Sequence, residues 1–167
     1  MPAPQANDDF ANFSWHDNYI YSLHFVIQGW NAGLVLDIDH IVEWIRGVDG
    51  GAQFRVAPAT LTFHHVTDLK LNIDWGDSGF QIALHEISIH QITRERITNQ
   101  KICLDRPYYR WSIETNFPRP GSITFGADNF TQILRAEPIT QDEQKLPRES
   151  RVAYSGRGSR EESDPPL

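Results

Sequence analysis

The sequence predicts an all-β protein, an antiparallel sandwich or open barrel of about eight or nine short strands with at most one short helix. Three observations lead to this prediction. Apolar side chains recur at every second position in segments such as residues 69–75, and a period of two places them on one face of a strand. Gly, Pro, Asp and Asn interrupt the pattern at short intervals, as turns do. The strand–helix–strand spacing of a parallel nucleotide-binding sheet is missing from the sequence.

The elements follow from this pattern in chain order. The first strand is expected at residues 19–27, and a Gly-rich turn at 29–33 leads into a second that begins at residue 34. Residues 40–46 also fit helical spacing, but a strand is preferred because the two-residue period continues through them. Further strands are expected at residues 54–65, 69–75, 82–89, 102–104, 109–117 and 123–125, with a last short element of uncertain type at 130–135. A change of phase at residues 85–86 predicts a β-bulge there.

The length and composition suit a single domain with extensions. Of 167 residues, 40% are apolar and 11% aromatic, which is enough for a hydrophobic core. We expect a flexible leader at residues 1–12, one β-rich domain at 13–139 and a disordered charged tail at 140–167. The tail is predicted because few large apolar residues follow position 140, and such a segment buries too little surface to offset its ordering entropy.

Charge and targeting signals limit the possible partners. The net charge of −7 argues against a nucleic-acid partner, because phosphate binding needs clustered Lys and Arg. The single cysteine, Cys103, cannot form an intramolecular disulfide, and no signal peptide is recognisable. No apolar run approaches the roughly 20 residues that a membrane span needs. The expectation is a soluble cytoplasmic protein without a membrane partner.

Trp15, His16 and Asp17 place an aromatic ring, an imidazole and a carboxylate side by side just before the first strand. In a catalytic interpretation, Asp17 would orient His16. Neighbouring side chains in an extended segment point in opposite directions, however, so a direct dyad is not expected. The preferred interpretation is structural: Trp15 caps the core, and His16 or Asp17 holds a turn.

Asp37, Asp39 and His64 are the other candidate site residues. The two carboxylates lie two positions apart on one strand face, and His64 lies on the polar face of its own strand. Such groups can bind metals or perform acid–base chemistry. The metal-binding spacings H-x-H, H-E-x-x-H and C-x-x-C do not occur, so we assign no metal, cofactor or catalytic residue. The expected role of Asp37 and Asp39 is the solvent side of an amphipathic strand.

The segment W-H-D-N-Y-I-Y-S-L at residues 15–23 resembles the W-H-D-x-x-I-x-x-L opening of small uncharacterised bacterial proteins, immunity-protein-like and YxiG-like sequences among them. Residues 56–70 and 130–138 resemble further blocks of such proteins. The resemblance implies a compact bacterial β-rich domain and no particular reaction. An immunity role, in which the protein binds and inhibits a toxin, is implied only by association.

These observations lead to a functional hypothesis and two alternatives. The hypothesis is a non-enzymatic binding domain with a protein partner, such as a toxin, that uses residues among Trp15, His16, Asp17, Asp37, Asp39 and His64. The first alternative is a metal-dependent enzyme that uses His and Asp on a sheet face. The second is a module that binds a small ligand through exposed Trp side chains.

Overall fold

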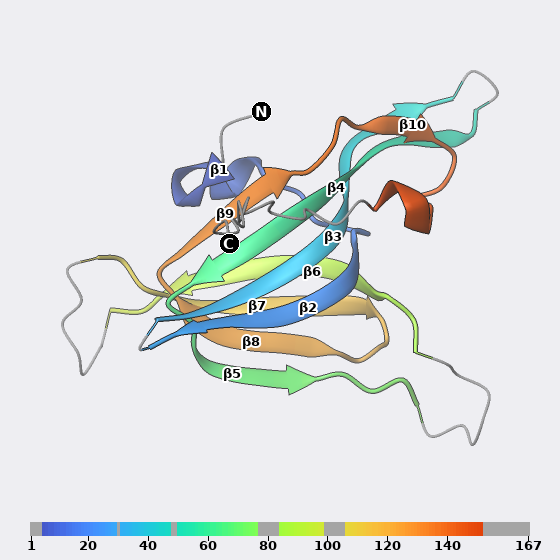
Figure 1. The fold of residues 1–167 in the computed structure, drawn as a ribbon. Coiled ribbons are helices and arrows are strands. Elements are labelled where there is room, and N and C mark those ends of the chain that lie inside the picture. Colours follow the sequence, from blue (N-terminus) through green and yellow to red (C-terminus); the bar gives the residue numbers. More distant parts are fainter. Residues whose placement is uncertain (1–4, 30, 48–49, 77–83, 99–105, 152–167) are drawn as a thin grey trace, which may run out of the picture.

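The computed structural model describes residues 5–29, 31–47, 50–76, 84–98 and 106–151. Within these residues the chain is all-β, as predicted, and all strand pairs are antiparallel (Figure 1). The strands are β1 (Gln5–Ala6), β2 (Tyr19–Gln28), β3 (Asn31–Arg46), β4 (Ala52–His64), β5 (Thr67–Asn72), β6 (Ile87–Arg96), β7 (Tyr109–Phe117), β8 (Ser122–Ala127), β9 (Asn129–Leu134) and β10 (Ile139–Gln141). Two 3₁₀ helices complete the fold, η1 (Asn7–Asn12) and η2 (Arg148–Ser150).

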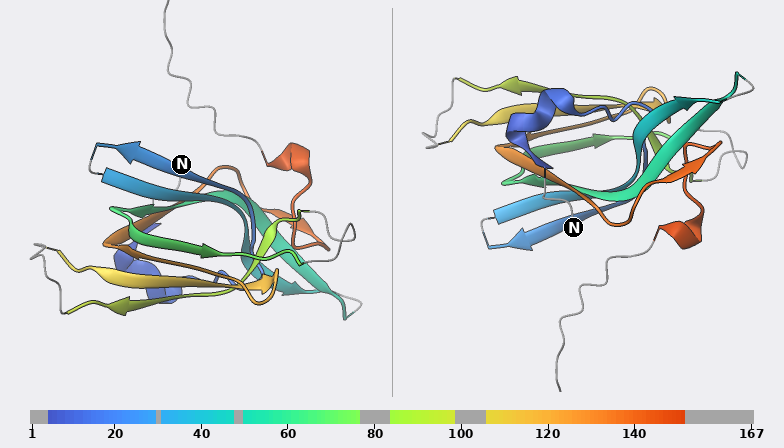
Figure 2. Two further views of the ribbon diagram at one scale, coloured as in Figure 1. Left: turned by 90° about the horizontal axis from the view of Figure 1, so that it is seen from below. Right: turned by 90° about the horizontal axis from the view of Figure 1, so that it is seen from above.

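The strands form one open sheet in the order β1-β9-β4-β3-β2-β6-β7-β8-β5, and β10 pairs with β4. The connection between β2 and β6 is the narrowest point of the sheet. Only the pairs Tyr19↔Ser88 and Ile20↔Ile87 join these strands, and beyond Ile20 they diverge. The half that contains β4, β3 and β2 therefore turns to face the half that contains β6, β7 and β8 (Figures 1 and 2).

The main core lies between the two halves. Leu34, Leu36 and Ile38 of β3 are buried in it. From β4, Phe63 makes edge contacts with Trp111 of β7 and Phe125 of β8, at ring-centroid distances of 5.0 and 4.7 Å. Burial of each large apolar side chain contributes roughly 1.5–3 kcal/mol, so these contacts hold the two halves together.

β3 is a single long strand, and the strand predicted over residues 40–46 is confirmed. Its register with β4 shifts between Ile41 and Glu43, which is the signature of a β-bulge. Ile38 lies in the main core, whereas Ile41 belongs to a second buried cluster with Phe54, Val56 and Leu146. Ile38 and Ile41 differ in parity, so the second cluster lies on the outer face of β3 and β4.

The folded region extends beyond both predicted domain boundaries. Within the predicted leader, Phe10 contacts the rings of Trp15 and Trp111 at 5.6 and 5.4 Å. Within the predicted tail, β10 pairs with β4 and Leu146 is buried. The composition argument missed these segments because one or two apolar side chains are enough to anchor a short segment to an existing sheet. The rest of the predicted tail, residues 152–167, lies outside the described residues.

Other predicted elements have mixed outcomes. The element at residues 130–135 is a strand, β9. The strand predicted over 82–89 begins only at Ile87, and its register shifts lie between Ser88 and Gln91 rather than at residues 85–86. The predicted strand at 102–104 lies outside the described residues, as do positions 82 and 83.

Candidate functional site

Trp15 is a core residue, in agreement with the structural interpretation. Its ring stacks on Phe13 with centroids 5.0 Å apart, and its Nε1 donates a hydrogen bond of 2.8 Å to Gln132 Oε1. Trp15 is buried, so its ring cannot serve as a surface contact for a partner.

The neighbouring His16 and Asp17 come closer together than an extended backbone allows. Asp17 has φ 61°, and this left-handed turn places His16 Nε2 3.6 Å from Asp17 Oδ2. The expectation that the two side chains diverge is therefore wrong. Asp17 Oδ1 accepts a hydrogen bond from Asn116 at 2.7 Å, and Oδ2 accepts one from Gln144 at 3.3 Å. At 3.6 Å the imidazole is too distant for a hydrogen bond, so Asp17 links β7 to the C-terminal segment rather than activating His16.

Asp37 and His64 have different partners. Asp37 Oδ1 accepts a hydrogen bond of 2.8 Å from Thr60 Oγ1 and lies 3.6 Å from Arg135 Nη1. His64 Nε2 lies 3.0 Å from Thr131 Oγ1 on β9, and burial lowers the pKa of His64. Asp37 thus links β3 to β4, and His64 links β4 to β9. In the part of the chain that the structure describes, no group of three or more His, Cys, Asp or Glu side chains is placed to hold a metal ion.

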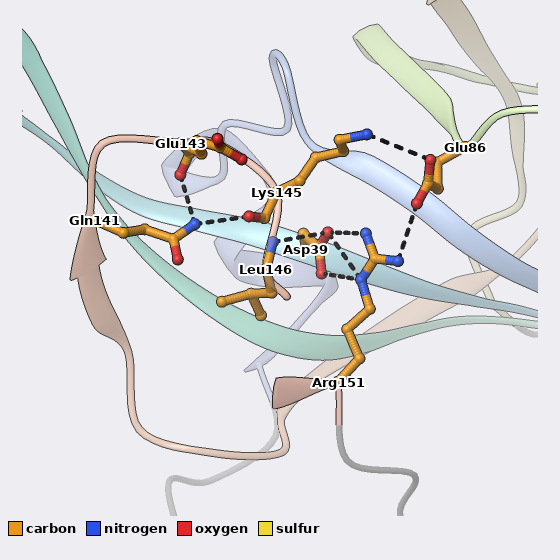
Figure 3. Close-up of polar contacts among 7 residues, drawn as sticks. All are labelled: Asp39, Glu86, Gln141, Glu143, Lys145, Leu146 and Arg151. Atoms are coloured by element: carbon orange, nitrogen blue, oxygen red, sulfur yellow. Dashed lines mark hydrogen bonds and ion pairs between the residues drawn. The ribbon is translucent and has the colours of Figure 1, made fainter. Parts of the chain in front are cut away.

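Asp39 is the largest departure from expectation. Its side chain is 0% exposed, so the prediction that it faces solvent is wrong. The C-terminal segment covers it: Leu146 N–H donates to Asp39 Oδ2 at 3.2 Å, and Arg151 Nη2 donates to the same oxygen at 2.6 Å (Figure 3). Burial raises the pKa of Asp39, although the hydrogen bonds and charge of Arg151 oppose that rise.

Arg151 bridges two carboxylates from distant parts of the sequence. Besides Asp39, it donates from Nη1 to Glu86 Oε1 at 3.0 Å, and Lys145 Nζ lies 3.5 Å from the other oxygen of Glu86 (Figure 3). Burial alone would lower the pKa of Arg151, but the bonds to Asp39 and Glu86 raise it overall. The pKa of Glu86 is lowered by its own backbone N–H and by Arg151. The guanidinium carbon also lies 4.5 Å from the centre of the Tyr21 ring.

The C-terminal turn is itself hydrogen-bonded. Gln141 Nε2 donates to the carbonyl oxygens of Glu143 and Lys145 at 2.6 and 2.8 Å. This side chain closes the turn that presents Leu146 and Arg151 to β3 (Figure 3).

A hollow of about 680 Å³ lies beside Arg151, where β2 and β6 diverge. We call it the fork hollow. It is lined by Ile20, Tyr21, Ser22, Leu23, Trp75, Leu84, His85, Glu86, Ile87, Arg148 and Arg151. Leu84 is 78% exposed, more than any other large apolar side chain of the described residues. Within those residues the exposed side chain of Arg148 has no hydrogen bond or ion pair, so it is the uncompensated cation of the hollow.

Sequence reasoning missed Glu86, Leu146, Arg148 and Arg151. No local pattern relates Arg151 to Asp39, since 112 residues separate them. Leu146 did carry a signal, because it is an isolated large apolar residue in a polar segment.

The fold and this site define an all-β domain, built on one open antiparallel sheet, whose C-terminal segment is fastened to the outer face of β3 by a buried ion pair. Neither the comparison with protein-family models nor the search of curated proteins finds a match for this chain. Among the described residues, no helix has the length and apolar character to cross a membrane.

Proposed function

We propose that this chain is a non-enzymatic protein-binding domain and that a partner protein docks in the fork hollow. The observation that carries the proposal is Leu84, a large apolar side chain that is 78% exposed at a hollow. An isolated exposed Leu needs no explanation, but this one lies with Trp75, Tyr21 and Arg148 around one concave surface. Trp, Tyr and Arg are the residue types that dominate the binding energy of protein interfaces.

The charges around the hollow indicate what the partner presents. Arg151 is neutralised by Asp39 and Glu86, so the cation left for a partner is Arg148. A partner that places a carboxylate at Arg148 and an apolar side chain between Trp75 and Leu84 fits this surface. The resemblance of residues 15–23 to immunity-like proteins favours a toxin as this partner.

The state of the nearby carboxylates supports binding rather than catalysis. A general base needs a carboxylate that can reach a substrate proton. Asp39 is fully buried under the C-terminal segment, and Glu86 is held by Arg151 and Lys145. Both carboxylates are therefore engaged in ion pairs that stabilise the fold.

The test compares matched variants in partner capture from a lysate of the native host. The wild-type chain and Leu71→Asp, a control at a 49% exposed position on β5, are expected to retain the same partner. Leu84→Asp and Arg148→Glu are expected to lose it, and the recombinant partner should bind these two variants about tenfold or more weakly in calorimetry. Capture of no stoichiometric partner, or equal capture by all four proteins, would rule the proposal out.

A further inference from the structure

β2 leaves one backbone edge unpaired over most of its length. On one side it pairs with β3 as far as Gln28, but on the other it pairs with β6 only at Tyr19 and Ile20. Among the described residues, no strand pairs with that side of β2 from residue 21 onward. In both views of Figure 2, β2 is the outermost strand of the β2–β3 hairpin. Such an edge presents a row of free N–H and C=O groups to another strand.

The pairing with β3 shows which backbone groups are free. The carbonyl oxygen of Ala32, the residue opposite Ile27, accepts a hydrogen bond from Val66 N–H at 2.8 Å and so points away from β2. In an antiparallel ladder, both members of such a pair point outward, and the pattern repeats at every second residue. Leu23, Phe25 and Ile27 therefore direct their N–H and C=O groups toward the free edge.

This edge lacks the features that usually prevent strand addition. Residues 21–28 contain no Asp, Glu, Lys, Arg or Pro. Phe25 and Ile27 are 50% and 73% exposed, and Val26 between them is also exposed. Charged side chains, Pro and bulges normally protect an edge strand. The bulge of β2 lies between Ile20 and Ser22, so it leaves the exposed part of the strand regular.

We propose that this edge binds a second copy of the same chain, with the two β2 strands antiparallel about a two-fold axis at Phe25. A two-fold axis brings each residue close to its own equivalent, so a charged surface opposes its own copy. The chain carries a net charge of −7, whereas residues 21–28 carry no formal charge with His neutral. The uncharged strip is therefore the surface on which two copies can meet without repulsion.

The position of the axis follows from the neighbouring strands. Centred on Phe25, the two strands overlap over residues 22–28, and Leu23 lies opposite Ile27 of the second copy. The overlap ends before Ile20, where β6 already occupies the edge. Both Phe25 residues direct their backbone groups at each other, as a hydrogen-bonded pair requires. The contact would extend the antiparallel sheet through both copies.

Sedimentation velocity of the full chain over a hundredfold range of concentration tests this inference. We expect a concentration-dependent dimer. Phe25→Glu sets two carboxylates against each other on the axis, so it should raise the dissociation constant about tenfold or more. Leu71→Glu, at a similarly exposed position on β5, the strand at one end of the sheet, should leave that constant unchanged. Circular dichroism is the control for folding, and both variants should keep the β-sheet signal of the wild type.

Cross-linking provides a second readout that does not depend on weakening the dimer. Directly opposed residues lie about 5.5 Å apart between Cα atoms, within disulfide range. Phe25→Cys in a Cys103→Ser background should therefore form a covalent dimer under mild oxidation, whereas Leu71→Cys should not. A monomer at every concentration, or a dimer that Phe25→Glu leaves intact, overturns the inference. Ser22 and Leu23 belong both to the paired segment and to the lining of the fork hollow. Leu84 and Arg148, whose variants test the partner site, lie outside the paired segment, so the two proposals are tested by different substitutions.

Discussion

Arg151 donates hydrogen bonds from Nε and Nη2 to both oxygens of Asp39, a fully buried carboxylate 112 residues earlier in the chain. A residue of the C-terminal segment thus contacts the middle of β3, the longest strand among the described residues. Removal of an ion from water costs several kcal/mol, and the paired charge and hydrogen bonds offset that cost. Loss of one partner leaves the other buried without compensation.

The first prediction concerns this ion pair. Arg151→Met should lower the free energy of unfolding by about 3 kcal/mol, because it leaves the Asp39 carboxylate buried and unpaired. Urea unfolding followed by tryptophan fluorescence measures the change. Arg148→Met, three residues earlier and exposed, serves as the control and should cost less than about 0.5 kcal/mol.

Neutralisation of the carboxylate should recover part of this loss. In the Arg151→Met background, Asp39→Asn removes the unpaired charge, so the double variant should be more stable than Arg151→Met alone. If Arg151→Met unfolds at the same urea concentration as the wild type, the ion pair does not hold the C-terminal segment.

Leu146 carries the second prediction. It is buried with Ile41, Phe54 and Val56 on the outer face of β3 and β4. Leu146→Ala should cost about 2–3 kcal/mol, because it removes buried apolar surface and leaves a cavity. Ile139→Ala, at an exposed position of β10, should cost clearly less in the same urea titration. Equal effects of the two substitutions would show that the second cluster adds little stability.

Local patterning predicted the strands well, because alternation is a property of neighbouring residues. The strand expected at 109–117 coincides with β7, and that expected at 19–27 is one residue shorter than β2. The same rule placed Asp39 on the solvent face of β3, since it alternates with Leu36 and Ile38. Nothing within that strand indicates that the C-terminal segment covers this face.

The other failures at the candidate site also concern features that strand alternation does not describe. The divergence of His16 and Asp17 was inferred for an extended backbone, but Asp17 adopts a positive φ. The leader was assigned by composition, yet Phe10 reaches the core rings. The contacts of Phe10 with Trp111 and of Asp39 with Arg151 join segments about a hundred residues apart, and a two-residue period carries no information about them.

The third prediction concerns pH and His40. Asn18 Oδ1 accepts a hydrogen bond from Ile41 N–H at 3.1 Å, so its amide Nδ2 faces His40 Nδ1 at 2.8 Å and donates to it. Protonation of Nδ1 would place two donors against each other. Burial lowers the pKa of His40 to about 4, from an ordinary value of 6.5. Neutral His40 therefore contributes stability that is fully present above pH 6.5 and is lost as the pH falls toward about 4.

Unfolding at two pH values measures this contribution. Between neutral pH and pH 4 the unfolded chain binds a proton that the folded chain excludes, which corresponds to about 3 kcal/mol at most. His40→Gln removes the titrating group, so its stability should fall less than that of the wild type over this interval. His85→Gln, at an exposed position just before β6, is the control, and its stability should fall as much as that of the wild type. Parallel pH profiles for all three proteins would contradict the assignment.

The last prediction concerns the close approach at Gly126 on β8. A Cβ atom there would lie 2.7 Å from Thr67 Oγ1 and 2.7 Å from the hydroxyl oxygen of Tyr108. These two oxygens are hydrogen-bonded to each other at 2.7 Å, and the Tyr108 hydroxyl also donates to the His65 carbonyl at 3.3 Å. Gly126→Ala should cost about 1–3 kcal/mol, because backbone and ring must separate to admit the methyl group. For a chain of this size that corresponds to a melting temperature lower by roughly 2–12 °C.

Gly51→Ala is the matched control, since a Cβ at Gly51 meets no atom within 4 Å, and calorimetry should find its melting temperature close to that of the wild type. Equal melting temperatures for the two variants would mean that β5, β8 and Tyr108 are not packed as tightly as these distances require.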